Sequence, residues 1–245
     1  MKYHTFQGLI FDFNSSIIMK MKNQYVGDIS DYRKYDLLQL ISDELNEKIL
    51  VVWMLTPYEN NNDGKYIKYL NYNKNKKYNK TLFEGLKTIV SGERNINNVQ
   101  KLPCFNNSDN FIFHSDKLED DINKREEYFN NAIEKAKTAK IVFFDPDNGI
   151  APDDKKNKSD KYLFWNEIMR FWEKGKDILV FQYFPYFCNR EKYTNDKIND
   201  FANNFNINKD NIISFNAKKV VYLFITHNTI NKRNELINKW GKWNT

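Results

Sequence analysis

The amino-acid sequence predicts an α/β fold: a Rossmann-like, mostly parallel sheet flanked by helices, with a small helical insertion. Three observations support this prediction. Short apolar runs recur along the chain. Segments with helical spacing of apolar residues separate them, which is typical of a parallel sheet. The length of 245 residues, with 41% hydrophobic residues, suits a single domain over residues 1–245 with an insertion at about 56–110.

Six runs are predicted to be strands because each is rich in β-branched or aromatic residues and is bounded by polar or turn residues. They are Leu9–Phe13, Ile49–Leu55, Phe111–His114, Ile141–Phe144, Ile178–Phe184 and Val220–Thr226. Runs that are apolar throughout indicate strands covered on both faces, as in parallel sheets.

The segments between these runs are predicted to be helices. They are a helix from an Asp31 N-cap to about Leu45, Thr81–Val90, Ile122–Ala139, Lys161–Lys174, Asp196–Phe205 and Ile230–Trp240. In the third of these, Ile122 and Phe129 are expected on one buried stripe. Two polar stretches, Thr56–Lys80 and Ala151–Asp160, interrupt the alternation and are candidate lid or substrate loops.

The formal net charge is +6 and the sequence pI is about 9.0. A basic surface attracts phosphate, which favours nucleic acid or a nucleotide as partner, although general lysine enrichment would give the same excess. Cys104 and Cys188 lie far apart and fit reduced thiols. No apolar run approaches the roughly 20 residues that span a bilayer, so no membrane partner is expected and the predicted location is cytoplasmic. The oligomeric state is not predicted.

The most informative segment is the end of the Ile141–Phe144 run, where Asp145-Pro-Asp-Asn-Gly149 follows directly. The carboxyl end of a strand in a parallel sheet opens into the ligand crevice, so Asp145, Asp147 and Asn148 are candidate catalytic residues. Gly149 permits a tight turn after them and is a candidate binding residue. A plain strand-ending turn is the alternative interpretation, since every residue in the segment is turn-prone.

A second segment, Gly27–Tyr35, leads into the first predicted helix. If Asp31 caps that helix, Asp31 and Lys34 lie on one side of its first turn, near the positive end of the helix dipole. This position suits a ligand carboxylate or phosphate, with Lys34 as the anion anchor. An ordinary capped helix with a surface Asp–Lys pair is the alternative.

The segment Gly27-Asp-Ile-Ser-Asp-Tyr-Arg-Lys-Tyr35 resembles the Gly-Asn-x-x-Asp-x-x-Lys-His signature of the large-subunit ribosomal RNA adenine-N6 methyltransferases. Gly27, Asp31 and Lys34 coincide in register, while Asp28 and Tyr35 replace Asn and His. The family has a Rossmann-like methyltransferase fold with an early helical insertion. Its later Asp-Pro-Pro-Tyr motif occupies the place of residues 145–148 here.

The resemblance implies S-adenosylmethionine as cofactor, with its amino-acid end near Lys34, and an adenine amino group held by the Asp145 segment. Gly27, Asp28, Asp31, Lys34, Tyr35 and Gly149 are therefore the candidate cofactor-binding or substrate-binding residues. Two departures are plain. The position of the family's glycine-rich donor loop reads Met54-Leu-Thr-Pro-Tyr-Glu-Asn60, and the second proline and the aromatic residue of Asp-Pro-Pro-Tyr are absent.

Asp147, in place of that second proline, permits a different chemistry. Together with Asp145 it would form an oxygen-rich site for Mg²⁺ or Mn²⁺, as in a nuclease or phosphoesterase. Three functions thus stay open: a nucleic-acid- or nucleotide-modifying enzyme of methyltransferase-like fold, a metal-dependent nuclease or phosphoesterase, and a non-catalytic nucleic-acid binder.

Overall fold

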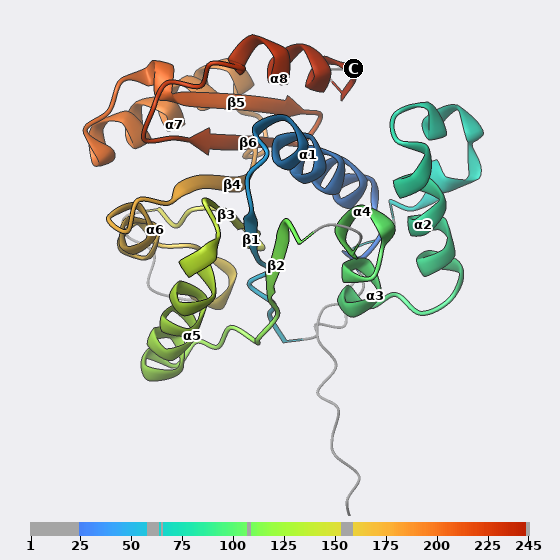
Figure 1. Ribbon diagram of the computed structural model, residues 1–245, viewed down its shortest axis with the longest axis horizontal. Coiled ribbons are helices and arrows are strands. Elements are labelled where there is room, and N and C mark those ends of the chain that lie inside the picture. Colours follow the sequence, from blue (N-terminus) through green and yellow to red (C-terminus); the bar gives the residue numbers. More distant parts are fainter. Residues whose placement is uncertain (1–24, 58–63, 65, 107–108, 153–158, 244–245) are drawn as a thin grey trace, which may run out of the picture.

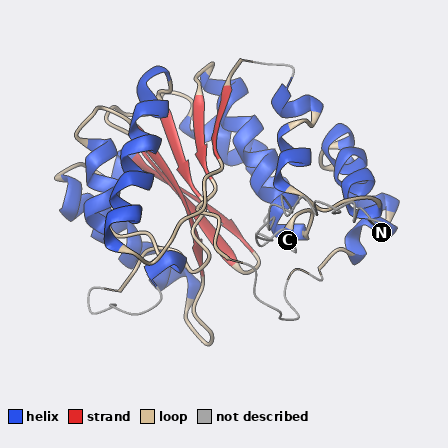
Figure 2. Ribbon diagram, turned by 90° about the horizontal axis from the view of Figure 1, so that it is seen from below, coloured by secondary structure: helices blue, strands red, loops and turns tan. Residues whose placement is uncertain are grey.

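The computed structural model describes residues 25–57, 64, 66–106, 109–152 and 159–243. These residues contain a six-stranded sheet in the order β2-β1-β3-β4-β6-β5, with helices on both of its faces (Figure 1, Figure 2). The predicted Rossmann-like α/β fold is therefore confirmed. The predicted strand Leu9–Phe13 lies outside the described residues.

Four strands form the parallel part of the sheet: β1 (Ile49–Val52), β2 (Phe111–His114), β3 (Ile141–Phe144) and β4 (Asp177–Tyr183). Val52 is paired with the last residue of β2 on one side and with Phe144 on the other, so three carboxyl ends finish level. The chain leaves β1 for β2 on one side and then crosses to β3 on the other. The ends of β1 and β3 therefore flank the topological switch point, where open α/β sheets bind ligands.

The other two strands, β5 (Ile212–Ala217) and β6 (Val220–Ile225), form a hairpin in which β6 is antiparallel to both neighbours. The sequence prediction found β6 and missed β5. Ser214 and Asn216 interrupt the apolar residues of β5, because this strand lies at the edge of the sheet and only one of its faces is fully covered. The other edge strand, β2, was found because its run is apolar, whereas the mixed residues of β5 give no such run.

Eight α-helices lie within the described residues: α1 (Ile29–Leu45), α2 (Lys80–Ser91), α3 (Ile96–Gln100), α4 (Pro103–Asn106), α5 (Ile122–Lys135), α6 (Trp165–Trp172), α7 (Arg190–Phe205) and α8 (Arg233–Trp240). Short 3-10 helices are η2 (Lys68–Asn71), η3 (Asn73–Lys77), η4 (Ala136–Thr138), η5 (Ser159–Lys161), η6 (Lys209–Asn211) and η7 (Gly241–Trp243). The helices between β1 and β2 occupy the segment in which we predicted an insertion, and they lie beside α1 (Figure 1).

Four details of the helix predictions are wrong. Helix α7 begins at Arg190 and not at Asp196, because the Asn189 side chain caps it there. The N-cap of α1 is Asp28, whose carboxylate accepts hydrogen bonds from the amides of Ser30 (2.7 Å) and Asp31 (2.9 Å). Ile122 is 79% exposed because it is the first residue of α5 and precedes the buried stripe. Helix α6 begins at Trp165 because the Glu167 carboxylate accepts from the Phe164 amide and fixes the start there.

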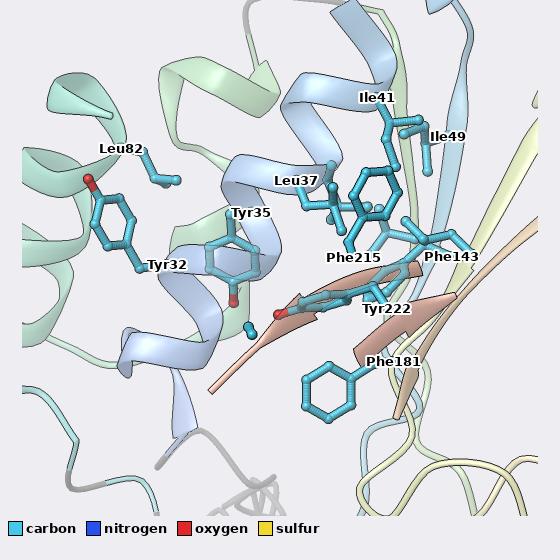
Figure 3. Packing of buried hydrophobic residues seen from close by; sticks show 14 of the residues in the cluster. Tyr32, Tyr35, Leu37, Ile41, Ile49, Leu82, Phe143, Phe181, Phe215 and Tyr222 are labelled. Atoms are coloured by element: carbon cyan, nitrogen blue, oxygen red, sulfur yellow. The ribbon is translucent and has the colours of Figure 1, made fainter. Parts of the chain in front are cut away.

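Two buried clusters cover the two faces of the sheet. Figure 3 shows the cluster between α1 and the sheet, in which the hydroxyl ends of Tyr35 and Tyr222 lie near the first turn of α1. Tyr35 donates to Asp31 (2.9 Å) and Tyr222 to the carbonyl of Ser30 (3.4 Å). Within the described residues, no helix is long and apolar enough to cross a membrane.

Candidate functional site

Lys34 joins the two segments that the sequence singles out. Its ammonium Nζ lies 2.9 Å from Asp31 Oδ1 and 2.6 Å from Asp145 Oδ2. All three side chains are at most 15% exposed. The first turn of α1 and the end of β3 therefore form one polar cluster at the carboxyl edge of the sheet, beside the switch point.

The first turn of α1 holds its acidic side chains by a compact set of hydrogen bonds. Gly27 has a φ of +83°, a conformation that glycine adopts without strain. Its amide donates to Asp31 Oδ2 (2.9 Å), which also accepts from Tyr35. The Gly27 carbonyl accepts from the Tyr69 hydroxyl (3.1 Å), which comes from the segment between β1 and β2. Both Asp31 oxygens are thus fixed, and Asp31 positions Lys34.

The end of β3 continues the sheet ladder for one residue, since the Asp145 amide donates to the Val52 carbonyl (3.1 Å). The chain then turns at Gly149, whose φ is +85°. A β-carbon at this glycine would lie 2.3 Å from Gln182 Oε1, so the Gln182 side chain packs directly on the turn. That same oxygen accepts from the Ile150 amide (2.8 Å). Asn148 is exposed, and its amide donates to the carbonyl of Lys161.

The loop after β1 supplies the opposite side of the switch point. The Thr56 hydroxyl donates to Asp147 Oδ2 (3.1 Å), which links the loops that follow β1 and β3. Met54 has a φ of +48°, which is unusual for a residue with a side chain. The hydroxyl of Tyr128 accepts a hydrogen bond from the Met54 amide (3.1 Å). The backbone at this loop therefore takes a left-handed conformation without a glycine.

Among the groups nearest to Lys34, carboxylates outnumber cations. Asp28, Asp31 and Asp145 lie around its ammonium, and the guanidinium groups of Arg33 and Arg94 act electrostatically on Asp28 from outside the cluster. Burial, together with the neighbouring Asp31, raises the pKa of Asp28 to about 7. Burial raises the pKa of Asp145 to about 6, against the opposing effect of Lys34. Although burial alone would lower it, the pKa of Lys34 is held well above its ordinary value by Asp145 and Asp31.

Aromatic rings surround the Lys34 ammonium. Its nitrogen lies 5.4 Å from the ring centre of Phe181, 5.7 Å from that of Tyr35 and 5.9 Å from that of Trp53. Such rings attract a cation and exclude water from it. Lys34 is thus a buried, carboxylate-bound cation with two of its three N–H groups engaged by Asp31 and Asp145, and its role as an anion anchor stays a prediction.

The structure brings the predicted residues together unevenly. Asp28, Asp31, Lys34, Tyr35 and Asp145 belong to the buried cluster. Asp147 and Gly149 border it, while Asn148 lies on the surface. Sequence reasoning missed Thr56, Tyr69 and Gln182, which fix the surrounding loops. Gln182 carried a usable signal, because a polar residue near the end of an apolar strand at the carboxyl edge faces the crevice. Thr56 and Tyr69 lie in a polar segment with no such signal.

A metal site receives no support from the arrangement of ligands. Lys34 lies against the Asp145 carboxylate and Thr56 against that of Asp147. In the part of the chain that the structure describes, no group of three or more His, Cys, Asp or Glu side chains is arranged to hold a metal ion.

Comparison with known proteins leaves the site to be interpreted from its own chemistry. A scan against protein-family models found no match, and a search of the curated proteins also found none.

Proposed function

We propose that this protein is an S-adenosylmethionine-dependent methyltransferase that modifies an amino group of a nucleic acid or nucleotide. One observation carries the proposal: the Lys34–Asp145 ion pair joins the start of α1 to the end of β3 at the switch point of the sheet. These are the two segments that resemble the donor-side and amine-side motifs of the ribosomal RNA adenine-N6 methyltransferases.

The charges of the cluster fit the donor. S-adenosylmethionine carries a positive sulfonium and a positive ammonium group besides its carboxylate, and the carboxylates of Asp28, Asp31 and Asp145 would attract the two positive groups. Asp28 and Asp31 at the start of α1, with Thr56 after β1, are the residues that would hold it. When bound, the donor supplies the methyl group. The left-handed backbone at Met54 replaces the conformational freedom of the glycine that the family has in this loop.

Asp145 is the residue that would hold the substrate amine. Lys34 occupies Oδ2, and within the described residues no group donates a hydrogen bond to Oδ1. The Asp145 side chain as a whole is 15% exposed. An ionised carboxylate accepts hydrogen bonds from an amino group and can take the proton that the amine loses on methylation. Lys34 favours this ionised form and fixes its orientation.

The proposal is tested by titration calorimetry with S-adenosylmethionine, followed by transfer of a tritiated methyl group to RNA, DNA or free nucleotides. Donor binding and transfer are expected, with transfer lost in Asp145→Asn. The matched control is Asp200→Asn, which makes the same chemical change at a half-exposed aspartate on α7. No heat at millimolar donor and no transfer would reject the proposal.

Two other results would point to the remaining functions. Cleavage of a phosphodiester that requires Mg²⁺ or Mn²⁺ and is lost in Asp145→Ala would identify a nuclease. Salt-sensitive binding of nucleic acid without turnover, unchanged in Asp145→Asn, would identify a non-catalytic binder.

A further inference from the structure

The loop after β4 exposes two large aromatic side chains. Tyr186 is 92% exposed and Phe187 is 103% exposed, and their ring centres lie 6.2 Å apart. Phe187 also has a φ of +60°, which is a true outlier for a bulky residue. Because the Phe187 ring lies in water, its strained backbone is not compensated by packing within the fold. Backbone strain of this kind clusters at active sites, ligand clamps and switch regions.

This loop lies next to the candidate site. Strand β4 continues past the residue paired with Phe144 and ends at Tyr183, which is 38% exposed. The rings of Tyr183 and Phe181 lie 4.7 Å apart, and the Phe181 ring lies 5.4 Å from the Lys34 ammonium. Contacting rings therefore connect the carboxylate cluster with the base of the exposed loop.

Tyr66, which is 62% exposed, extends the aromatic surface. Its carbonyl accepts from the amide of Ile29 (3.2 Å), at the start of α1, and its ring lies 4.5 Å from the ammonium of Lys219. The carbonyl of Lys219 in turn accepts from the amide of Phe184 (3.0 Å). We call Tyr66, Tyr183, Tyr186 and Phe187 the aromatic rim.

Basic side chains border this rim. Lys218 and Lys219, in the turn between β5 and β6, are exposed. Arg190 and Lys192, at the start of α7, are exposed as well, and the Arg190 guanidinium lies 5.8 Å from the ring centre of Phe184. Stacking surfaces interleaved with cations match a chain of bases joined by phosphates. They match an aliphatic membrane core or an apolar protein helix less well.

We propose that the aromatic rim binds single-stranded nucleic acid, with unpaired bases stacked on Tyr186 and Phe187 and with phosphates facing the basic border. Every base has a face that stacks on an aromatic ring, so binding of this kind tolerates different sequences. The inference extends the proposed function, since it names an unpaired strand as the substrate class. It rests on that function for its place in a reaction.

The test is fluorescence anisotropy with a labelled single-stranded oligonucleotide of about 12 residues, as RNA and as DNA, and with the matching duplex. Site sizes of this order occur in single-strand binders. We expect the single strands to bind more tightly than the duplex, and binding to weaken as salt increases. The double variant Tyr186→Ala/Phe187→Ala should raise Kd at least tenfold while the thermal melt stays unchanged, because both rings lie in solvent.

The matched control is Tyr72→Ala, which removes an aromatic side chain that is 55% exposed in the segment between β1 and β2. It should leave Kd unchanged. Lys218→Ala/Lys219→Ala should weaken binding and reduce its salt dependence. An unchanged Kd in the Tyr186/Phe187 variant, equal binding of duplex, or binding of anionic vesicles in place of oligonucleotide would overturn the inference. So would self-association in sedimentation that the same variant abolishes.

These measurements separate the inference from the proposed function because binding is measured without the methyl donor. Methyl transfer with an unchanged Kd in the Tyr186/Phe187 variant would reject the rim and keep the methyltransferase. Rim-dependent binding with no transfer to any substrate would keep the rim and reject the methyltransferase.

Discussion

Lys34 and Arg125 are both buried cations on helices, but their charges are balanced differently. Arg125 on α5 is 8% exposed and forms a two-pronged pair with Glu167 on α6, with distances of 2.5 and 2.9 Å. Arg125 also donates to the carbonyl of Tyr162 (2.7 Å), and Glu167 caps the start of α6. Lys34, which is 7% exposed, lies among three carboxylates.

The difference distinguishes a structural ion pair from a candidate site. At Arg125 one cation meets one carboxylate whose two oxygens both accept hydrogen bonds, and the pair joins two helices. Burial raises the pKa of Glu167 as well as those of Asp28, to about 7, and Asp145, to about 6, so these shifts do not separate the two regions. What differs is that carboxylates outnumber cations next to Lys34 and that Oδ1 of Asp145 accepts no hydrogen bond from the described residues.

The largest expected effect is a loss of unfolding free energy when the Arg125–Glu167 pair is broken. Arg125→Met leaves the Glu167 carboxylate buried without its cation, which should cost about 3–5 kcal/mol of unfolding free energy. Urea denaturation measures it. The control Arg170→Met, which breaks an exposed pair between the same two helices, should cost less than about 1 kcal/mol. Equal losses in the two variants would contradict the structural role of Arg125.

The next largest effect is the loss of stability when a glycine is replaced by alanine. We compare Gly149, beside the candidate site, with Gly175, after α6. Gly149→Ala places a β-carbon against Gln182 in a backbone with a φ of +85°, so we expect a loss of about 2–4 kcal/mol. Gly175 follows α6 with a φ of +75°, and a β-carbon at this position would meet nothing within 4 Å. Gly175→Ala therefore isolates the backbone strain, at about 1–2 kcal/mol. Matching losses in thermal melts would show that the Gln182 contact contributes nothing.

When the Lys34–Asp145 pair is altered, we expect the activity to change more than the stability. Asp145→Asn keeps the shape of the side chain and removes its charge, so methyl transfer should fall at least about 100-fold. The unfolding free energy should change by less than about 1 kcal/mol, because two effects offset each other. The substitution weakens one interaction of Lys34, but it also removes a buried negative charge whose raised pKa shows that burial disfavours it. Glu167→Gln should show the reverse pattern: reduced stability, with activity retained in the folded fraction. Loss of both properties in both variants would remove the distinction between the two pairs.

The smallest effect is a pH dependence at the N-cap of α1. The folded-state pKa of Asp28, about 7, lies above its ordinary 3.8, so ionisation of this group destabilises the fold as pH rises between these values. Asn caps helices as well as Asp and does not titrate. The melting temperature of Asp28→Asn, relative to the unaltered protein, should therefore rise from pH 5 to pH 8. A difference in melting temperature that stays constant with pH would show that ionisation of Asp28 does not destabilise the fold.

Much of the architecture could be predicted from the sequence because its signals are local. The run Ile141–Phe144 forms β3 with the predicted bounds, since a central parallel strand is buried on both faces and must be apolar throughout. The run Phe111–His114 also forms a strand with the predicted bounds, β2, although this strand lies at an edge of the sheet and is mostly half-buried. Edge strand β5 escaped the same reasoning because its exposed face tolerates Ser214 and Asn216.

The sequence by itself determined the central strands, most of the helices and the two polar segments at Gly27–Tyr35 and Asp145–Gly149. Only the tertiary structure decided what these segments do to each other. Lys34 and Asp145 are 111 positions apart, and the order of the strands brings them to one edge of the sheet. Burial there removes the water that would otherwise solvate the charges, so Asp28 and Asp145 acquire raised pKa values that no local pattern encodes.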